Sequence, residues 1–289
     1  MPVDDEIIDG VGAAAASYTD VTTGTSSLSG YSFVSKYNDE DPGNPALGLQ
    51  FVVYVSSDHS NVIVSFVGTN EGKDAIGDLD LAWDQFNNTE NKTAINDAIS
   101  NALTSYPDAA VTFAGHSAGG IIAQYAAYNY EATVDTGHDT IVNLVTNNAP
   151  GATDVLAAQA GVTTADIAAV ASNFNYVANT YEQDDIVHLM GSAYVGSTTD
   201  GAQTLAIVSP TVYDPISAHF SSNSTSDLAQ INLGTSGYSL VSDTPENFGI
   251  GRSLRDSAFW RADDCKKPTL LLSSSRLIPE LATDWGNGD

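Results

Sequence analysis

The chain of 289 residues has little positive charge and almost no cysteine. Nine Lys and Arg residues stand against 36 Asp and Glu residues, which gives a formal net charge of −27. Because such a surface repels nucleic acids and anionic membranes, neither is expected as a partner. The acidity fits adaptation to salty water, an acidic secreted protein or a plain solubility device. The single cysteine excludes an intrachain disulfide, and no Cys or His cluster has metal-ligand spacing, so we expect no metal and no cofactor.

Long apolar runs are also missing. No stretch of about 18 apolar residues occurs, so no transmembrane helix is expected. The first residues, MPVDDEIIDG, are acidic and lack the basic and apolar regions of a signal peptide. We therefore expect secretion by another route or with the leader removed, with a cytoplasmic location as the alternative. The 42% of apolar residues is still enough for a sizeable core.

The few basic residues are gathered near the C-terminus. Residues 1–251 contain three Lys and no Arg, whereas residues 252–289 contain six Lys and Arg residues balanced by six acids. This abrupt shift in composition predicts a boundary near Gly251. We interpret residues 1–251 as one catalytic domain. Residues 252–289 are interpreted as a distinct tail, either a disordered appendage or a segment of foreign origin.

The apolar patterns predict strands that alternate with helices after residue 90. The expected helices cover residues 3–18, 91–105, 120–130 and 152–172. The expected strands cover residues 31–37, 48–56, 61–66, 109–114, 139–147 and 175–178. Residues 179–250 are expected to be rich in loops. Because crossover helices join parallel strands, this order predicts an α/β fold with a mostly parallel central sheet, flanked by helices and edged by antiparallel early strands.

The pentapeptide Gly115-His116-Ser117-Ala118-Gly119 lies between an apolar strand and an alanine-rich helix. In this context G-x-S-x-G is typical of a nucleophile elbow, a sharp turn that exposes a serine hydroxyl. Glycines are needed at its two ends because a side chain there would clash with the neighbouring strand and helix. Ser117 is therefore the candidate nucleophile, and a plain glycine-rich turn is the alternative.

A serine hydroxyl is a poor nucleophile at neutral pH and needs a base, which in turn needs an orienting acid. In the chain order Ser, acid, His the base follows the serine, which excludes His59. His116 is expected to pack or hydrogen-bond behind the turn, and His138 precedes a strand at the wrong edge of the sheet. His188 can reach only a local partner, so His219, in a segment that can fold back over the elbow, is the expected base.

The acid and the oxyanion donors follow from the ends of strands. Asp185 comes just past the strand predicted at 175–178 and is the expected acid, with Asp184 and Asp214 as competitors. One oxyanion donor should be the backbone N–H of Ala118, directly after the nucleophile. The other should come from the loop after an earlier strand. There Gly68 permits close approach of the backbone, and Thr69 offers both an N–H and a hydroxyl.

Together these motifs resemble the class 3 (fungal-type) triacylglycerol lipases of the α/β-hydrolase superfamily. The resemblance covers roughly residues 45–220 and includes the late His219. Its segments are IVSFVGT (63–69), GDLDL (77–81), AGHSAGG (114–120), NNAPG (147–151) and DDIVHLM (184–190). It implies an α/β-hydrolase fold for residues 1–251, a triad of Ser117, Asp185 and His219, and an oxyanion hole of Thr69 and Ala118.

The resemblance also implies that Asp78 or Asp80 braces the oxyanion loop. Two positions depart from the family pattern. Val67 stands where the family usually has Arg, and His188 stands where a proline is common. In this family the segment after the oxyanion loop, here about Asn70–Asn91, forms a lid. Its apolar candidates are Ile76, Leu79, Leu81, Trp83 and Phe86; a short surface helix packed on the core is the alternative.

The resemblance implies a serine carboxylester hydrolase, a lipase or esterase that acts through an acyl-enzyme. Its substrate would be an ester or lipid, met in solution or at a lipid–water interface. The alternatives are a non-catalytic lipid- or protein-binding module on a hydrolase scaffold, and an acyltransferase that uses the same three residues.

Overall fold

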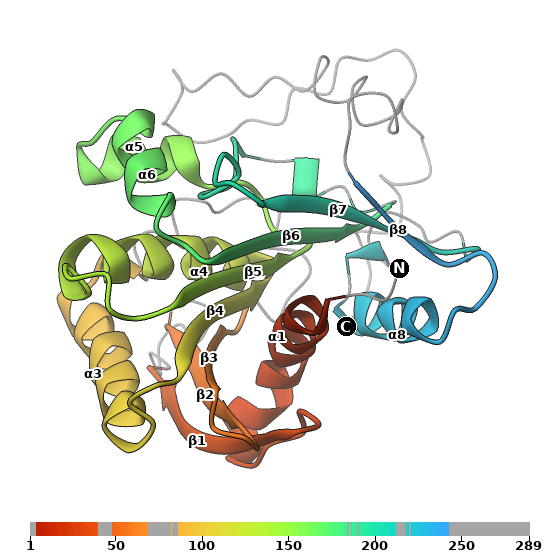
Figure 1. Cartoon of the computed structure of the whole chain (residues 1–289), viewed down its shortest axis with the longest axis horizontal. Helices are drawn as coiled ribbons and strands as arrows, with labels where there is room; N and C mark the ends of the chain where they lie inside the picture. The colour runs from red at the N-terminus through yellow and green to blue at the C-terminus, as the bar shows by residue number, and fades with distance from the viewer. Residues whose placement is uncertain are drawn as a thin grey trace, which may run out of the picture.

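The computed structural model describes residues 4–39, 48–68, 82, 86–183, 185, 187–189, 191–211, 218–219 and 221–242. Within these residues eight strands form one sheet in the order of the sequence (Figure 1). The strands are β1 (Tyr31–Asn38), β2 (Gln50–Ser56), β3 (Asn61–Phe66), β4 (Ala110–His116), β5 (Val142–Asn147), β6 (Tyr176–Glu182), β7 (Gln203–Val208) and β8 (Ser239–Ser242).

The middle of the sheet is parallel and its two edges are antiparallel. Strands β3 to β7 pair in parallel, whereas β1, β2 and β3 pair antiparallel in sequence. At the other edge β8 pairs antiparallel with β7. The structure therefore confirms the predicted mostly parallel α/β sheet and its antiparallel early strands. Parallel pairing brings the carboxyl ends of β3 to β6 to one edge, where a site is expected in such folds.

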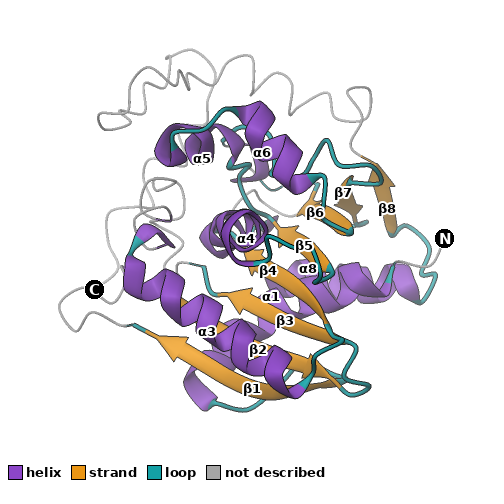
Figure 2. Ribbon diagram, turned by 60° about the vertical axis from the view of Figure 1, so that its left-hand side comes forward, coloured by secondary structure: helices purple, strands orange, loops and turns teal. Residues whose placement is uncertain are grey.

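Helices cover both faces of this sheet (Figure 2). They are α1 (Asp5–Thr23), α3 (Thr89–Ser105), α4 (Ala118–Asn129), α5 (Thr153–Ala160), α6 (Thr164–Ala171) and α8 (Ser221–Asn232), with a π-helical turn η2 (Tyr130–Val134) and a 3₁₀ turn η3 (Val187–Leu189). Helices α3, α4, α5 and α6 lie on one face, and α1 and α8 lie side by side on the other. No helix in the described part of the chain is long and apolar enough to cross a membrane.

Alternation along the strands divides the core between the two faces. On β4, Val111 and Phe113 pack in the large cluster beneath α3, α4 and α5, whereas Ala114 faces α1. Gly10 of α1 lies so close to Val145 that a Cβ atom there would come within 2.5 Å of that side chain. Helix α1 is therefore seated directly on the central strands, behind the elbow.

The observed elements depart from the predicted ones at several places. The helical region predicted over 152–172 is two helices, because Gly161 adopts a left-handed φ of 68° and ends α5. Strand β5 begins only at Val142, because the side chain of Asp135 accepts the backbone N–H groups of Asp139 and Thr140 in a preceding turn.

The expectation that residues 179–250 are mainly loop was wrong for part of that segment, which contains β7, α8 and β8. Helix α8 begins with the sequence SSNSTSD, whose Ser, Thr, Asn and Asp side chains compete with helical hydrogen bonds. Packing of its Leu228 in the same cluster as Ile7 of α1 compensates for this weak propensity. The tail predicted for residues 252–289 lies outside the described residues.

Candidate active site

Ser117 forms the turn between β4 and α4 and has a strained backbone. Its φ of 56° and ψ of −129° lie outside the regions that non-glycine residues normally adopt. The two flanking glycines make the turn possible, as predicted. A Cβ atom on Gly115 would come within 2.2 Å of the Gly119 carbonyl oxygen, and one on Gly119 within 2.3 Å of the Phe66 carbonyl oxygen.

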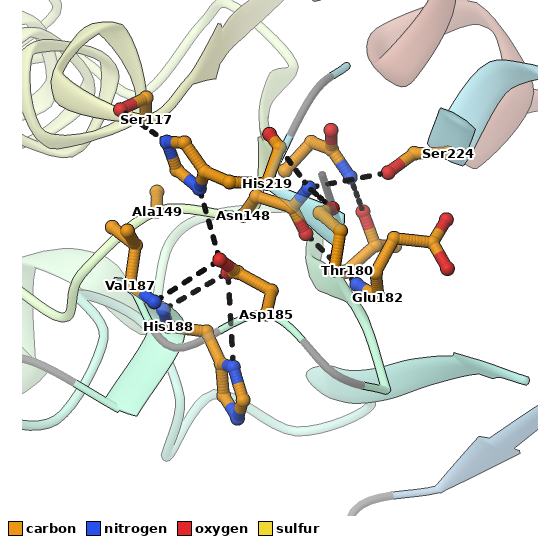
Figure 3. A network of polar contacts seen from close by, with 12 residues as sticks. Ser117, Asn148, Ala149, Thr180, Glu182, Asp185, Val187, His188, His219 and Ser224 are labelled. Carbon is orange, nitrogen blue, oxygen red and sulfur yellow. Dashed lines mark hydrogen bonds and ion pairs between the residues drawn. The ribbon is translucent and has the colours of Figure 1, made fainter. Parts of the chain in front are cut away.

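Three predicted side chains from distant parts of the sequence meet at this turn (Figure 3). The Oγ atom of Ser117 lies 2.8 Å from Nε2 of His219. On the other side of the same ring, Nδ1 lies 2.9 Å from Oδ1 of Asp185. Ser117 follows β4, Asp185 follows β6, and His219 comes two residues before α8. The fold thus brings together residues that are 34 and 102 positions apart.

Asp185 is almost fully buried, with 1% of its surface exposed. Its carboxylate accepts the backbone N–H groups of Val187 and His188, each at 3.0 Å. Burial opposes ionisation, but hydrogen bonds from His188 and His219 outweigh it and lower the pKa of Asp185 to about 2. The carboxylate is therefore ionised at neutral pH and can orient and stabilise an imidazolium.

His188 makes the local contact that its position predicted. Its ring stacks on Tyr181, with ring centres 3.7 Å apart, and its Nδ1 atom lies 3.7 Å from Oδ2 of Asp185. His188 is therefore a polar neighbour of the acid, and its described contacts are with Tyr181 and Asp185 rather than with the serine hydroxyl.

His116 lies behind the turn, as expected, and contacts two other segments. Its Nε2 atom is 2.5 Å from the backbone oxygen of His219, and its Nδ1 atom is 3.0 Å from the Tyr18 hydroxyl. Burial, with a contribution from the nearby His219, lowers the pKa of His116 to about 3, so this ring is neutral. Because a carbonyl oxygen only accepts, Nε2 carries the proton and Nδ1 accepts from Tyr18.

The loop after β3 also reaches the elbow. A Cβ atom on Gly68 would come within 2.4 Å of the Tyr18 hydroxyl and 3.3 Å of Cβ of Ser117, so the absence of a side chain permits this approach. Ala118 is the first residue of α4, and its N–H therefore has no acceptor within that helix. Thr69 and the two candidate bracing residues, Asp78 and Asp80, lie outside the described residues, as do Asp184 and Asp214.

Little of the segment predicted as a lid, Asn70–Asn91, is described. Within it, Ala82 and Phe86 are buried in the large core cluster, and the Phe86 ring lies 5.8 Å from that of Tyr125. Phe86 therefore packs on the core. Packing on the core was the alternative given above to a lid. The rest of the apolar candidates lie outside the described residues.

His138 lies away from the elbow. His138 precedes β5, as expected, and its Nδ1 pairs with the buried carboxylate of Glu131 in the turn that follows α4. Among the residues that the structure describes, no group of three or more His, Cys, Asp and Glu side chains could hold a metal ion.

Sequence reasoning missed two residues of this region, Tyr18 and Asn148. Tyr18 lies on α1, 98 positions before the His116 ring that it contacts. Asn148 directly follows β5 and has a left-handed φ of 48°. Its position in the segment NNAPG was noted, but nothing local in the sequence indicates that its side chain reaches residues 218 and 219.

Comparisons with known proteins agree with this arrangement. Residues 63–193 match the family model described as lipase (class 3). No curated protein sequence matches the chain. Several solved structures are similar to it, and three of them follow. A variant of MDLA from Penicillium cyclopium is 16% identical, with 89% of this chain and 94% of that chain covered and a TM-score of 0.53.

The triacylglyceride lipase of Rhizomucor miehei is 14% identical, with 70% of this chain and 78% of that chain covered and a TM-score of 0.50. A triacylglycerol lipase whose catalytic centre is described as a serine protease triad is also 14% identical, with the same coverage and a TM-score of 0.51. At these identities the similarity concerns the fold alone, which is an α/β-hydrolase fold. The segment matched by the family model carries the elbow and Asp185, and over this segment the chain is similar to the class 3 lipases. It is a carboxylic ester hydrolase of the lipase type.

Proposed function

We propose that this protein hydrolyses carboxylic esters through an acyl-enzyme, with Ser117 as nucleophile, His219 as general base and Asp185 as the orienting acid. The observation that carries the proposal is a continuous line of hydrogen bonds. It runs from Oδ1 of Asp185 through both ring nitrogens of His219 to Oγ of Ser117, with distances of 2.9 and 2.8 Å. This geometry lets one imidazole accept the serine proton while the buried carboxylate stabilises the charge that develops.

In the first half of the reaction, Oγ of Ser117 forms a bond to the ester carbonyl carbon as its proton passes to Nε2 of His219. The tetrahedral intermediate then loses the alkoxy group, which takes that proton from His219 and departs as the alcohol. In the second half, water attacks the acyl carbon and gives a proton to the same nitrogen. The bond to Oγ breaks, and the proton returns to Ser117. Asp185 stays ionised throughout, in keeping with its pKa of about 2.

The negative oxygen of each tetrahedral intermediate needs fixed donors. We propose the backbone N–H of Ala118 as one donor, because it stands at the N-terminus of α4 beside the nucleophile. Thr69 is proposed as the second, since Gly68 directly before it lies against Ser117. By resemblance to the family, Asp78 or Asp80 would hold the loop that carries Thr69.

The substrate is proposed to be an ester with an acyl-lipid part, because two of the similar structures are lipases of triacylglycerides or triacylglycerols. An interface between lipid and water is the proposed place of action. A jump in rate when a short-chain triacylglycerol is raised above its solubility would support that proposal. A smooth saturation curve would contradict it.

Added alcohol distinguishes hydrolysis from acyl transfer, since a transferase would form the new ester in preference to the free acid.

The decisive test is Ser117→Ala, assayed with p-nitrophenyl esters from short to long acyl chains. We expect turnover and covalent labelling by an organophosphonate to disappear, while the thermal unfolding curve shows an intact fold. Ser65→Ala is the matched control, because Ser65 is a fully buried serine on β3 whose hydroxyl has no partner among the described residues. This control should keep full activity. A Ser117→Ala protein with near wild-type turnover would sink the proposal.

A further inference from the structure

Asn148 connects the strand ends beside the elbow to the segment that carries His219. It is fully buried and directly follows β5. Its backbone N–H donates to the Thr180 carbonyl at 2.8 Å, and its Oδ1 accepts the Glu182 N–H at the same distance. These two bonds fix the residue to β6, the strand that leads to Asp185.

The amide nitrogen of Asn148 points the other way, towards residues 70 to 76 positions later in the chain (Figure 3). It lies 3.1 Å from the Ala218 carbonyl oxygen, 3.2 Å from the His219 carbonyl oxygen and 3.3 Å from the Ser224 hydroxyl. One side chain therefore holds the backbone on both sides of the peptide bond between Ala218 and His219, together with the first turn of α8.

The residue type fits this task. A residue at a φ of 48° must tolerate the left-handed region, which Asn, Asp and Gly do best. Of these three, Asn alone offers an amide that donates on one side and an oxygen that accepts on the other. Asp would turn a carboxylate oxygen towards two carbonyl oxygens, and Gly would leave them without this partner.

We propose that Asn148 is a positioning residue for the reaction, which keeps the imidazole of His219 between Ser117 and Asp185. The inference rests on the function proposed above. The His219 ring must meet two atoms at once, at 2.8 and 2.9 Å, and a misplacement of about 1 Å can cost on the order of 100-fold in rate. Asn148 acts on the backbone of His219 and touches no reacting atom.

The test compares Asn148→Asp and Asn148→Gly with Asn143→Ala in the full chain. Both Asn148 variants accept the left-handed backbone but remove the amide donor. Asn143 is the matched control, since it is a buried Asn near the start of β5 whose side chain bonds Thr112 and Asn175 at the amino ends of the strands, opposite Asn148. The assays are kcat and KM with a soluble p-nitrophenyl ester, the rate of organophosphonate labelling, and thermal unfolding.

We expect kcat and the labelling rate to fall by about 100-fold in folded Asn148 variants, with KM changed less than threefold. In the same Asn148 variants, the downfield proton resonance of the His219 Nδ1–H bonded to Asp185 should broaden or vanish. Asn143→Ala should leave kcat, the labelling rate and this resonance unchanged. Wild-type kcat in Asn148→Gly, or an equal loss in Asn143→Ala at equal stability, overturns the inference. If Asn148→Asp does not fold, Asn148→Gly decides alone. The proposed function fails separately, through an active Ser117→Ala variant.

Discussion

The amino ends and the carboxyl ends of the strands in the central sheet carry similar polar residues, but these residues have different kinds of hydrogen-bond partner. Near the amino ends of the strands, side chains form a row of hydrogen bonds that runs from β1 to the residue before β6. The row consists of Tyr31, Asn61, Thr112, Asn143 and Asn175. At the carboxyl edge, Asn148 and Ser117 bond instead to segments that come 70 and 102 positions later.

Under the proposed function, the amino ends of the strands contribute stability and the carboxyl ends carry the chemistry. Within the row at the amino ends, Thr112 and Asn143 are also register partners of β4 and β5. At the carboxyl edge, two residues hold strained left-handed backbones, and a buried carboxylate stays charged. Strain of this kind costs about 1–3 kcal/mol for each residue and persists where the surrounding structure enforces it.

The largest effect is expected from Asp185→Asn at the carboxyl edge. An amide cannot stabilise the imidazolium and favours the wrong ring tautomer, so kcat should fall by about 10³- to 10⁴-fold. The Val187 N–H donates to Oδ1 and the His188 N–H to Oδ2, so the amide keeps an acceptor for one of them, and the loss of a single hydrogen bond should leave the protein folded. Ester turnover measures the loss of kcat, and circular dichroism on the same sample measures whether the variant is folded. Activity within tenfold of the wild type would contradict the role of Asp185.

A smaller effect, confined to stability, is expected from Thr112→Val at the amino edge. The change keeps the volume but removes the hydroxyl that donates to Asn61 and accepts from Asn143. Leaving these amide atoms without a partner should lower the free energy of unfolding by about 1–2 kcal/mol. Urea unfolding measures this loss, and kcat/KM of the folded protein should stay unchanged. A drop in kcat/KM at unchanged stability would show that the two edges are coupled.

The smallest effect concerns the pH dependence of stability through His116. Its pKa in the folded protein is about 3, below the value of an unfolded chain. Below pH 6.5 the His116 ring therefore binds a proton in the unfolded chain but stays neutral in the folded protein, so the free energy of unfolding falls as the pH falls. Between pH 6.5 and 5.5 this amounts to about 1 kcal/mol.

His116→Gln keeps a donor and an acceptor but cannot be protonated. Urea unfolding at pH 6.5 and 5.5 should show that the variant loses about 1 kcal/mol less than the wild type over this interval. Parallel losses in the two proteins would mean that the buried ring does not resist protonation.

Much of the fold could be predicted because its signals are local. The helix before β1, the first three strands, α3, and the strand–turn–helix around Ser117 follow from apolar spacing, glycines and a Tyr-Pro stop. Helix α8 could not, since its polar first turns have weak propensity and its place is set by packing on α1. Without α8, the sequence gives no reason why residues 218 and 219 should lie beside Asn148.

The candidate site divides in the same way. Ser117 could be predicted from its own pentapeptide, and Asp185 from its place after a strand. His219 could be selected by chain order, whereas its two hydrogen bonds at 2.8 and 2.9 Å are facts of the folded chain. Tyr18 and Asn148 were missed because both act on partners at least 70 residues away.

By itself the sequence determined most of the elements up to β6 and the elbow, since helix, strand and turn preferences act over a few neighbouring residues. Only the tertiary structure decided which distant side chains face one another. That outcome depends on strand order and on the seating of α1 and α8 against the sheet, where many weak contacts act together and no short motif records the result.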